Sequence, residues 1–433
     1  MIGNLKEIDY KSIAHWLTTG FFENDKKSFL KKLAYENNLS PNFEWFHNPR
    51  NITFRNAVNE FGDLFESIII EKTKNKNIVL PLSGGLDSRT IAAALKNNKN
   101  VVSYSYQFDN GIPEINYGKR IAKLYDWRFH EYIIQKGYLW QKIEELSNLN
   151  KCRVEFTHPR QMACIDKISK LGNILISGSM GDLLFDSFSL KNQADKQQQL
   201  LFLKKIIFKN SGMKLAEDFW SHWNLDSDLE SYMDKILINY INSTQISNVP
   251  NKIRAIKVQY YVKNWTNTNL NIFNNFISTF APYHDERMCE FICGLPEEYL
   301  KGRIIQIAYL KKKSPELANI PWQAYDLNLY QIKRFNTFHL PIRMKNFFKR
   351  LVSYQILRNK EPIIRNWEIQ FLEDENISFL EDWLFNKPKL NLLIPNNIVS
   401  KFYNKFKNSN KVYYSHAISM LLTLSVWCDQ NLE

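Results

Sequence analysis

The chain has few cysteines and no long apolar run, and both features narrow the class of protein to which it can belong. Its 433 residues contain five cysteines, an odd number that favours reduced thiols over a disulfide framework. No run of about 18 apolar residues occurs, and no charged-then-apolar leader follows Met1, so neither a membrane span nor a secretory signal is expected. We therefore expect a cytoplasmic protein with no membrane partner.

Two common phosphate-binding patterns are also missing. The first strand-to-helix turn lacks the Walker pattern G-x-x-x-x-G-K-[ST], and no G-x-G-x-x-G fingerprint with its ribose acid occurs, which leaves a kinase-like or dinucleotide function without support. An apolar strand over 77–82 instead runs into Ser-Gly-Gly-Leu-Asp-Ser at 83–88, and a helix follows over 88–96. This pattern matches the pyrophosphate loop of enzymes that split ATP into AMP and pyrophosphate.

The physical chemistry of this turn suits an anion. Gly84 and Gly85 let the backbone approach a phosphate, and the N–H groups at the start of the following helix stabilise its charge. Asp87, placed beside bound phosphates, is most simply a magnesium ligand. A glycine turn that binds nothing is the alternative, but Ser83 and Asp87 at these offsets favour function.

Strands and helices alternate through the first half of the chain. Strands are expected over 77–82, 101–106, 129–134 and 173–177, and helices over 88–96, 114–125, 138–149 and 160–171. This alternation predicts an α/β fold with a doubly wound parallel sheet.

The length exceeds what one hydrophobic core usually holds, so two packed units are expected, and an N-terminal appendage is compatible with this length. Residues 1–70 read as a mainly helical segment, 71–190 as the α/β domain and 191–433 as a mainly helical second lobe.

A second turn resembles the first. Gly178 and Gly181 follow the strand ending at Ser177, and Asp182 comes directly after them. Two strand-end turns, each with glycine and one carboxylate, could hold a magnesium–pyrophosphate group from both sides. The alternative role for Asp182 is a helix N-cap, which is compatible with metal binding.

The two turns together resemble the synthetase half of the asparagine synthetase family, which includes β-lactam synthetase and lasso-peptide cyclases. The similarity extends over about 52–325, with weaker matches at Pro282–Asp285 and Gly294–Pro296, and residues 8–50 resemble a glutaminase-to-synthetase linker. It implies an ATP-pyrophosphatase fold, with ATP and Mg2+ as cofactors.

The resemblance also implies site residues. Ser83, Gly84, Gly85 and Ser88 would contact the phosphates, Leu82 and Tyr106 would flank the adenine, Gly178 would line the nucleotide, and Asp87 and Asp182 would hold the metal. Tyr106 could equally be a buried strand aromatic, and for Glu114 we favour an ordinary first-turn helix charge.

Departures from the family pattern affect the second half-reaction. The nucleophilic Cys of glutamine-dependent members is absent after Met1, so ammonia, a separate glutaminase or a substrate amine is expected to supply nitrogen. Ser179 stands where amidating members carry an acid that helps deprotonate the amine. Gln323 and its neighbours replace a pyrophosphate-binding Lys, so we expect Arg334 or Lys333 to supply the cation.

These observations favour a ligase that adenylates a small-molecule carboxylate and transfers the acyl group to ammonia or an amine, in specialised-metabolite or surface-sugar amidation. A tRNA-modifying enzyme of the lysidine synthetase type is one alternative. The net charge of +13 would suit nucleic acid, but the lysines are spread widely and we consider nucleic acid unlikely. A degenerate nucleotide-binding subunit is the other alternative.

Overall fold

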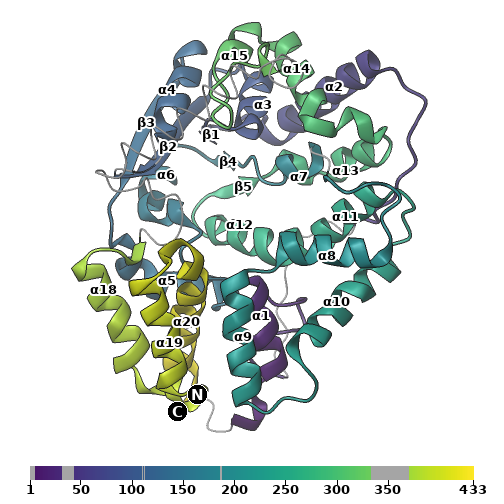
Figure 1. Ribbon diagram of the computed structural model, residues 1–433. Helices are drawn as coiled ribbons and strands as arrows, with labels where there is room; N and C mark the ends of the chain where they lie inside the picture. Colours follow the sequence, from purple (N-terminus) through teal and green to yellow (C-terminus); the bar gives the residue numbers. More distant parts are fainter. Residues whose placement is uncertain (1–4, 32–42, 110, 112, 186–187, 333–369) are drawn as a thin grey trace.

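The structure is a computed structural model that describes residues 5–31, 43–109, 111, 113–185, 188–332 and 370–433. Five parallel strands form one sheet in the order β3-β2-β1-β4-β5 (Figure 1). The strands are β1 (Ile78–Pro81), β2 (Val101–Phe108), β3 (Arg128–Ile134), β4 (Ile174–Ile176) and β5 (Ser278–Phe280). The predicted α/β class with a parallel sheet is confirmed, and the first four strands fall where the sequence placed them.

Strand β5 was not predicted. It lies at one edge of the sheet and pairs only with β4, Ser278 opposite Ile174. Its three residues, Ser-Thr-Phe, are exposed or half-buried, so they lack the apolar run that marks a strand buried on both faces. The sheet therefore includes a strand from the region expected to be a helical lobe.

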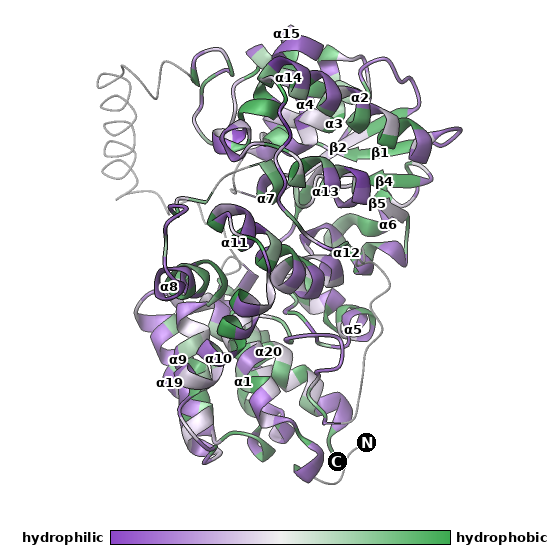
Figure 2. Ribbon diagram, turned by 90° about the vertical axis from the view of Figure 1, so that its right-hand side faces the viewer, coloured by the Kyte–Doolittle hydropathy of each residue, from purple (hydrophilic) through white to green (hydrophobic). Residues whose placement is uncertain are grey.

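Alternate residues of the central strands face two different layers, as the two-residue period of a strand requires. Ile78 and Leu80 of β1 belong to one core cluster. Its helices are α2 (Phe54–Thr73), α3 (Leu86–Ala94), α13 (Glu286–Cys293), α14 (Ile304–Lys313) and α15 (Pro315–Asn319), and α4 (Glu114–Leu124) packs on β2 beside them. Val79 of β1 and Leu175 of β4 face the second cluster. Figure 2 shows the apolar strands β1 and β4 enclosed between helices.

The second cluster continues into the lower, helical part of the molecule (Figure 1). Phe29 stacks on Trp427 with ring centroids 4.5 Å apart, so the N-terminal segment packs against the last helix. The helices of this part are α1 (Tyr10–Thr19), α5 (Tyr138–Asn150), α6 (Ile165–Ile168), α8 (Lys196–Ile207), α9 (Asn210–His222), α10 (Leu229–Ser243), α11 (Val249–Lys257), α12 (Asn267–Asn274), α18 (Asp374–Glu381), α19 (Asn396–Asn408) and α20 (Lys411–Asn431).

Two helical expectations need correction. The described residues 20–31 and 43–53 form no helix. Gly20 ends α1 in the left-handed conformation, with φ +90°. The helix predicted over 160–171 is a 3-10 turn, Arg160–Cys164, followed by the single turn α6. The domain boundaries at 70 and 190 stay a prediction, although α2 packs on one face of the sheet and β5 is one of its strands.

None of the helices in the described part of the chain is long and apolar enough to cross a membrane.

Candidate active site

A cavity of about 350 Å3 lies where β1, β2 and β4 end. This is the edge of a parallel sheet at which ligands bind in open α/β folds. Six predicted nucleotide residues line it, namely Leu82, Ser83, Asp87, Ser88, Tyr106 and Gly178. Tyr106 is only half-buried, so it is part of the cavity wall and not simply a core aromatic. The remaining lining residues are Pro81, Gln107, Phe108, Gly111, Glu114, Arg160 and Gln161.

The first loop is held in shape by its own serines. The Ser83 backbone N–H donates to Ser88 Oγ at 3.2 Å, and the Gly85 N–H donates to Ser83 Oγ at 3.3 Å. Gly85 caps helix α3 in an extended conformation without a side-chain hydrogen bond. The helix therefore begins at the cavity with its N-terminal N–H groups directed towards the loop, as phosphate binding requires.

The two predicted turns meet. A Cβ atom added to Gly178 would lie 3.1 Å from Asp87 Cβ, and one added to Gly181 would lie 2.2 Å from Asp87 Oδ1. Only glycine can bring the second turn this close to the first carboxylate. The sequence expectation that both turns serve one site is therefore supported by their contact in space.

The Asp87 carboxylate is surrounded by groups from the helical part of the chain. Its Oδ1 accepts hydrogen bonds from the Arg303 guanidinium and from Gln306 Nε2, the latter at 3.3 Å. Burial raises the pKa of Asp87 to about 6, the Arg303 charge opposes that rise, and the Asp182 charge adds to it. A second cation beside Asp87 would favour the ionised form further.

Arg303 and Gln306 were not predicted as site residues. Arg303 lies in the left-handed region with φ +61°, just before α14, and follows Gly302 at φ +64°. A non-glycine residue in this region is strained, and strained residues cluster at functional sites. A Lys-Gly-Arg sequence gives no signal of that role.

Asp182 lies in the first turn of the short helix α7 (Gly181–Phe185) and is exposed. Within the described residues, no group of three or more His, Cys, Asp or Glu side chains could hold a metal ion. Magnesium bound to ATP needs only one or two carboxylates, because phosphate oxygens and water complete its coordination. Asp87 and Asp182, on two turns in contact, fit that requirement.

The other two predicted catalytic residues are placed differently. Ser179 lies in the second turn, where its N–H donates to Ser177 Oγ at 3.2 Å, and it is not one of the residues that line the cavity. Arg334 and Lys333, the predicted pyrophosphate cations, lie outside the described residues.

Arg160 is the cation that the cavity itself supplies. It begins the 3-10 turn Arg160–Cys164 and lines the cavity. Its Nε is buried without a hydrogen-bond partner in the structure as described. Its charge acts on Tyr106, where it opposes the rise in pKa that burial causes. A buried donor without a partner is costly, so a ligand atom that accepts from Arg160 would be stabilised.

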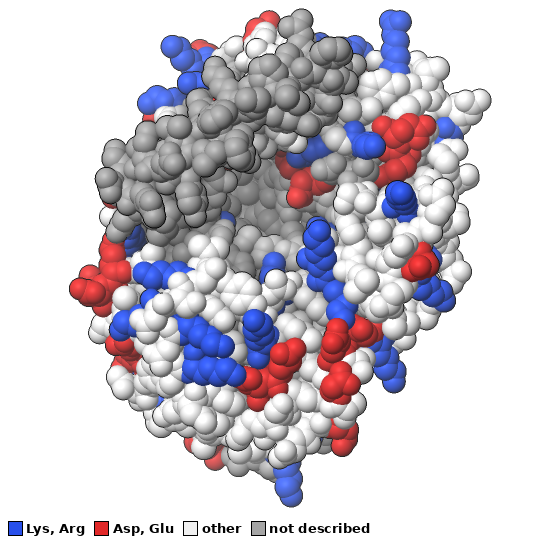
Figure 3. All heavy atoms as spheres, in the orientation of Figure 1, with Lys and Arg blue, Asp and Glu red and all other residues white. Residues whose placement is uncertain are grey.

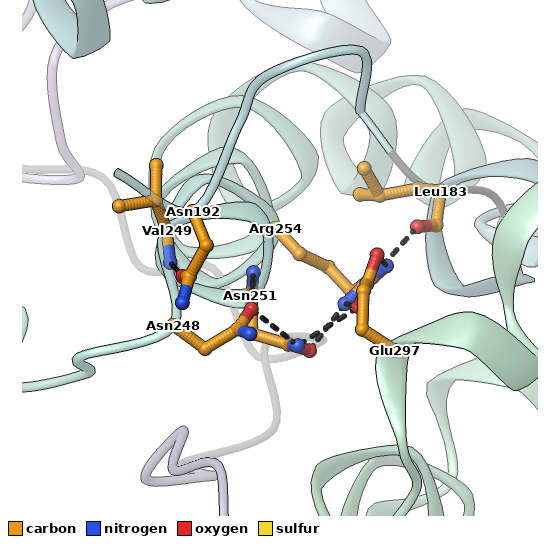
Figure 4. A network of polar contacts seen from close by, with 7 residues as sticks. All are labelled: Leu183, Asn192, Asn248, Val249, Asn251, Arg254 and Glu297. Atoms are coloured by element: carbon orange, nitrogen blue, oxygen red, sulfur yellow. Dashed lines mark hydrogen bonds and ion pairs between the residues drawn. The ribbon is translucent and has the colours of Figure 1, made fainter. Parts of the chain in front are cut away.

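A buried ion pair contacts the backbone of α7, the short helix that carries Asp182 (Figure 4). Arg254 of α11 is fully buried and donates to both carboxylate oxygens of Glu297, at 3.0 and 3.1 Å. Its Nε donates to the Leu183 carbonyl oxygen at 3.3 Å. Leu183 follows Asp182 directly, so Arg254 positions the second turn without reaching the cavity.

Replacement of Arg254 should destabilise the fold strongly. We expect Arg254→Ala to lower the free energy of unfolding by about 3–5 kcal/mol, because Glu297 is left as a half-buried carboxylate without its cation. Urea unfolding would measure this loss. Lys401→Ala, which breaks the exposed pair of Lys401 and Asp218, is the control and should cost less than about 1 kcal/mol. Equal, small losses would contradict the role assigned to Arg254.

The sequence model of the asparagine synthase family matches residues 70–304, which is more than half of the chain and includes both turns. The chain therefore belongs to the asparagine synthase family. That membership supports an ATP-using ligase of the synthetase type, and it agrees with the cavity between the two glycine turns.

Two solved structures show partial likeness. NMN synthetase from Francisella tularensis is 15% identical, with a TM-score of 0.26, and the match covers 49% of this chain and 96% of that one. The NH3-dependent NAD synthetase from Campylobacter jejuni is 17% identical, with a TM-score of 0.24, over 48% of this chain and 96% of that one. No curated protein matches the sequence.

Proposed function

We propose that the chain forms an amide bond in two steps, with an acyl-adenylate between them. A substrate carboxylate oxygen attacks the α-phosphorus of ATP, the bond from that phosphorus to the bridging oxygen breaks, and pyrophosphate leaves. Ammonia or an amine then attacks the acyl carbon, loses a proton, and displaces AMP. The observation that carries this proposal is the contact of the Gly178–Gly181 turn with Asp87 at the mouth of the phosphate loop.

Each part of the cavity has a task in the first step. The amides of Ser83–Ser88 and the start of α3 would hold the departing pyrophosphate. Leu82, which directly follows β1, and Tyr106 of the neighbouring β2 would flank the adenine base. Arg160 would stabilise charge at the α-phosphate, and Arg303 would keep the Asp87 carboxylate oriented.

Asp87 and Asp182 are the residues that would hold Mg2+. When bound, the ion would neutralise charge on the phosphates and orient them for displacement.

We assign fewer side chains to the second step, in which the amine attacks the acyl carbon. Ser179 replaces the acid that amidating members carry, and a serine hydroxyl is a poor base at neutral pH. An amine that arrives already neutral, including free ammonia or ammonia from a separate glutaminase, therefore suits the site best. We accordingly propose a specialised amidation and not routine asparagine supply.

A tRNA-modifying function is the weaker candidate. On the face of the molecule seen in Figure 3, Lys and Arg side chains lie among Asp and Glu side chains, and the described surface there presents no continuous basic stripe. Proteins that bind nucleic acid usually present such a basic surface, because contacts of Lys and Arg with phosphates supply much of the affinity.

The test is pyrophosphate exchange into ATP across a panel of carboxylic acids, with hydroxylamine to trap the acyl-adenylate. We expect exchange that depends on one class of acid and a hydroxamate formed from that same acid. Turnover of ATP to ADP and phosphate, or nucleotide binding with no exchange for any acid, would contradict the proposal. The latter result would favour the degenerate binding subunit.

A further inference from the structure

The phosphate loop already holds an anion. The Gly84 backbone N–H donates to Glu114 Oε2 at 3.2 Å, and Glu114 lines the cavity. Glu114 belongs to the first turn of α4, where we expected only a helix charge. Its carboxylate instead lies where an N–H group of the loop would meet a phosphate.

Gln323 fixes that carboxylate in place. Its Nε2 donates to Glu114 Oε1 at 2.7 Å, and its backbone N–H donates to the Gly84 carbonyl oxygen at 3.2 Å. A Cβ atom on Gly84 would lie 2.5 Å from Gln323 Cβ, so only glycine permits this approach. Gln323 thus bridges the loop and the carboxylate.

The segment that carries Gln323 is itself anchored to the loop helix. Arg89 of α3 is fully buried and donates to the carbonyl oxygens of Ile320 and Pro321, at 2.7 and 2.9 Å. Because this anchor holds the backbone just before Gln323, the Glu114 and Gln323 side chains are the parts left to rearrange when the loop changes partner.

We propose that Glu114 and Gln323 form a latch that occupies the phosphate loop and that the pyrophosphate part of ATP must displace. One N–H group cannot serve two anions, and the Glu114 carboxylate and a phosphate repel each other at hydrogen-bonding distance. The latch therefore lowers the affinity for ATP and occupies the Gly84 N–H until nucleotide arrives. This inference rests on the proposed function, because it assigns the loop to the pyrophosphate of ATP.

If the latch competes with pyrophosphate, removal of the Glu114 charge should raise the affinity for ligands that contain pyrophosphate and leave the affinity for AMP unchanged. We expect Glu114→Gln, which keeps the shape and removes the charge, to bind ATP about tenfold more tightly, a difference of ~1.4 kcal/mol. Pyrophosphate alone should gain similarly. AMP, which has no group to meet Gly84, should bind with unchanged affinity. Gln323→Leu, which frees the carboxylate without removing it, should show a smaller gain for ATP.

Isothermal titration calorimetry of the full chain with ATP, pyrophosphate and AMP measures these affinities. Glu131→Gln is the matched control, because Glu131 is an exposed acid paired with Lys119, and we expect no change in it. Unchanged or weaker ATP binding by Glu114→Gln, or an equal gain for AMP, would overturn the latch while the proposed function stands. If neither the wild type nor Glu114→Gln binds ATP, the latch and the proposed function are both wrong. If only Glu114→Gln binds ATP, the latch is supported.

Discussion

Replacement of Asp182 by Asn should abolish pyrophosphate exchange and leave the fold unchanged. The side chain is exposed, so the neutral amide costs little stability, but an amide cannot replace the carboxylate that we propose as a ligand of Mg2+. We expect a loss of at least about 100-fold, the scale on which single transition-state contacts act. Exchange with the cognate acid and urea unfolding would measure the two properties side by side.

Asp87→Asn should lose exchange to the same extent but also lose stability. Arg303, whose side chain is only 9% exposed, would be left without its carboxylate, at a cost of about 3 kcal/mol. Asp166→Asn is the control, since the Asp166 side chain is 70% exposed and is not part of the cavity lining. Exchange retained in both Asp182→Asn and Asp87→Asn would show that the metal lies elsewhere.

Arg160→Ala is also expected to have a large effect, a loss on the order of 100-fold in the exchange rate. The described cavity lining contains no other Lys or Arg side chain. Arg160 Nε makes no hydrogen bond within the described residues, so it is available to a ligand. Arg160→Lys should recover part of the rate, because it restores the charge without the planar fork of donors.

The matched control removes an exposed cation from the same part of the fold. Arg128 of β3 is exposed, and Arg128→Ala should exchange pyrophosphate at the wild-type rate. If Arg160→Ala also exchanges pyrophosphate at the wild-type rate, Arg160 does not stabilise charge at the α-phosphate, and its proposed role in the first step is wrong.

The sequence predicted those features that short-range patterns encode. Strand β1, the Ser-Gly-Gly turn and helix α3 are contiguous, so their order along the chain is also their order in space. The meeting of Gly178 with Asp87 could be anticipated as well, because neighbouring parallel strands end at the same edge of the sheet.

The partners of these residues could not be predicted in the same way. Arg303 reaches Asp87 across 216 residues of chain, and Gln323 reaches Glu114 across 209. One sequence gives no sign of such pairs, because each depends on how the helices pack. Glu114 illustrates the point, since a carboxylate in a first helical turn has a sufficient local explanation and its contact with Gly84 is visible only in three dimensions.

A crystal structure with Mg2+ and α,β-methylene ATP, which cannot be cleaved at the inner bond, would show whether the two turns bind one nucleotide. We expect the β- and γ-phosphates on the Ser83–Ser88 loop and a metal that touches both Asp87 and Asp182. A nucleotide bound away from the loop, or a metal held by neither carboxylate, would contradict this expectation.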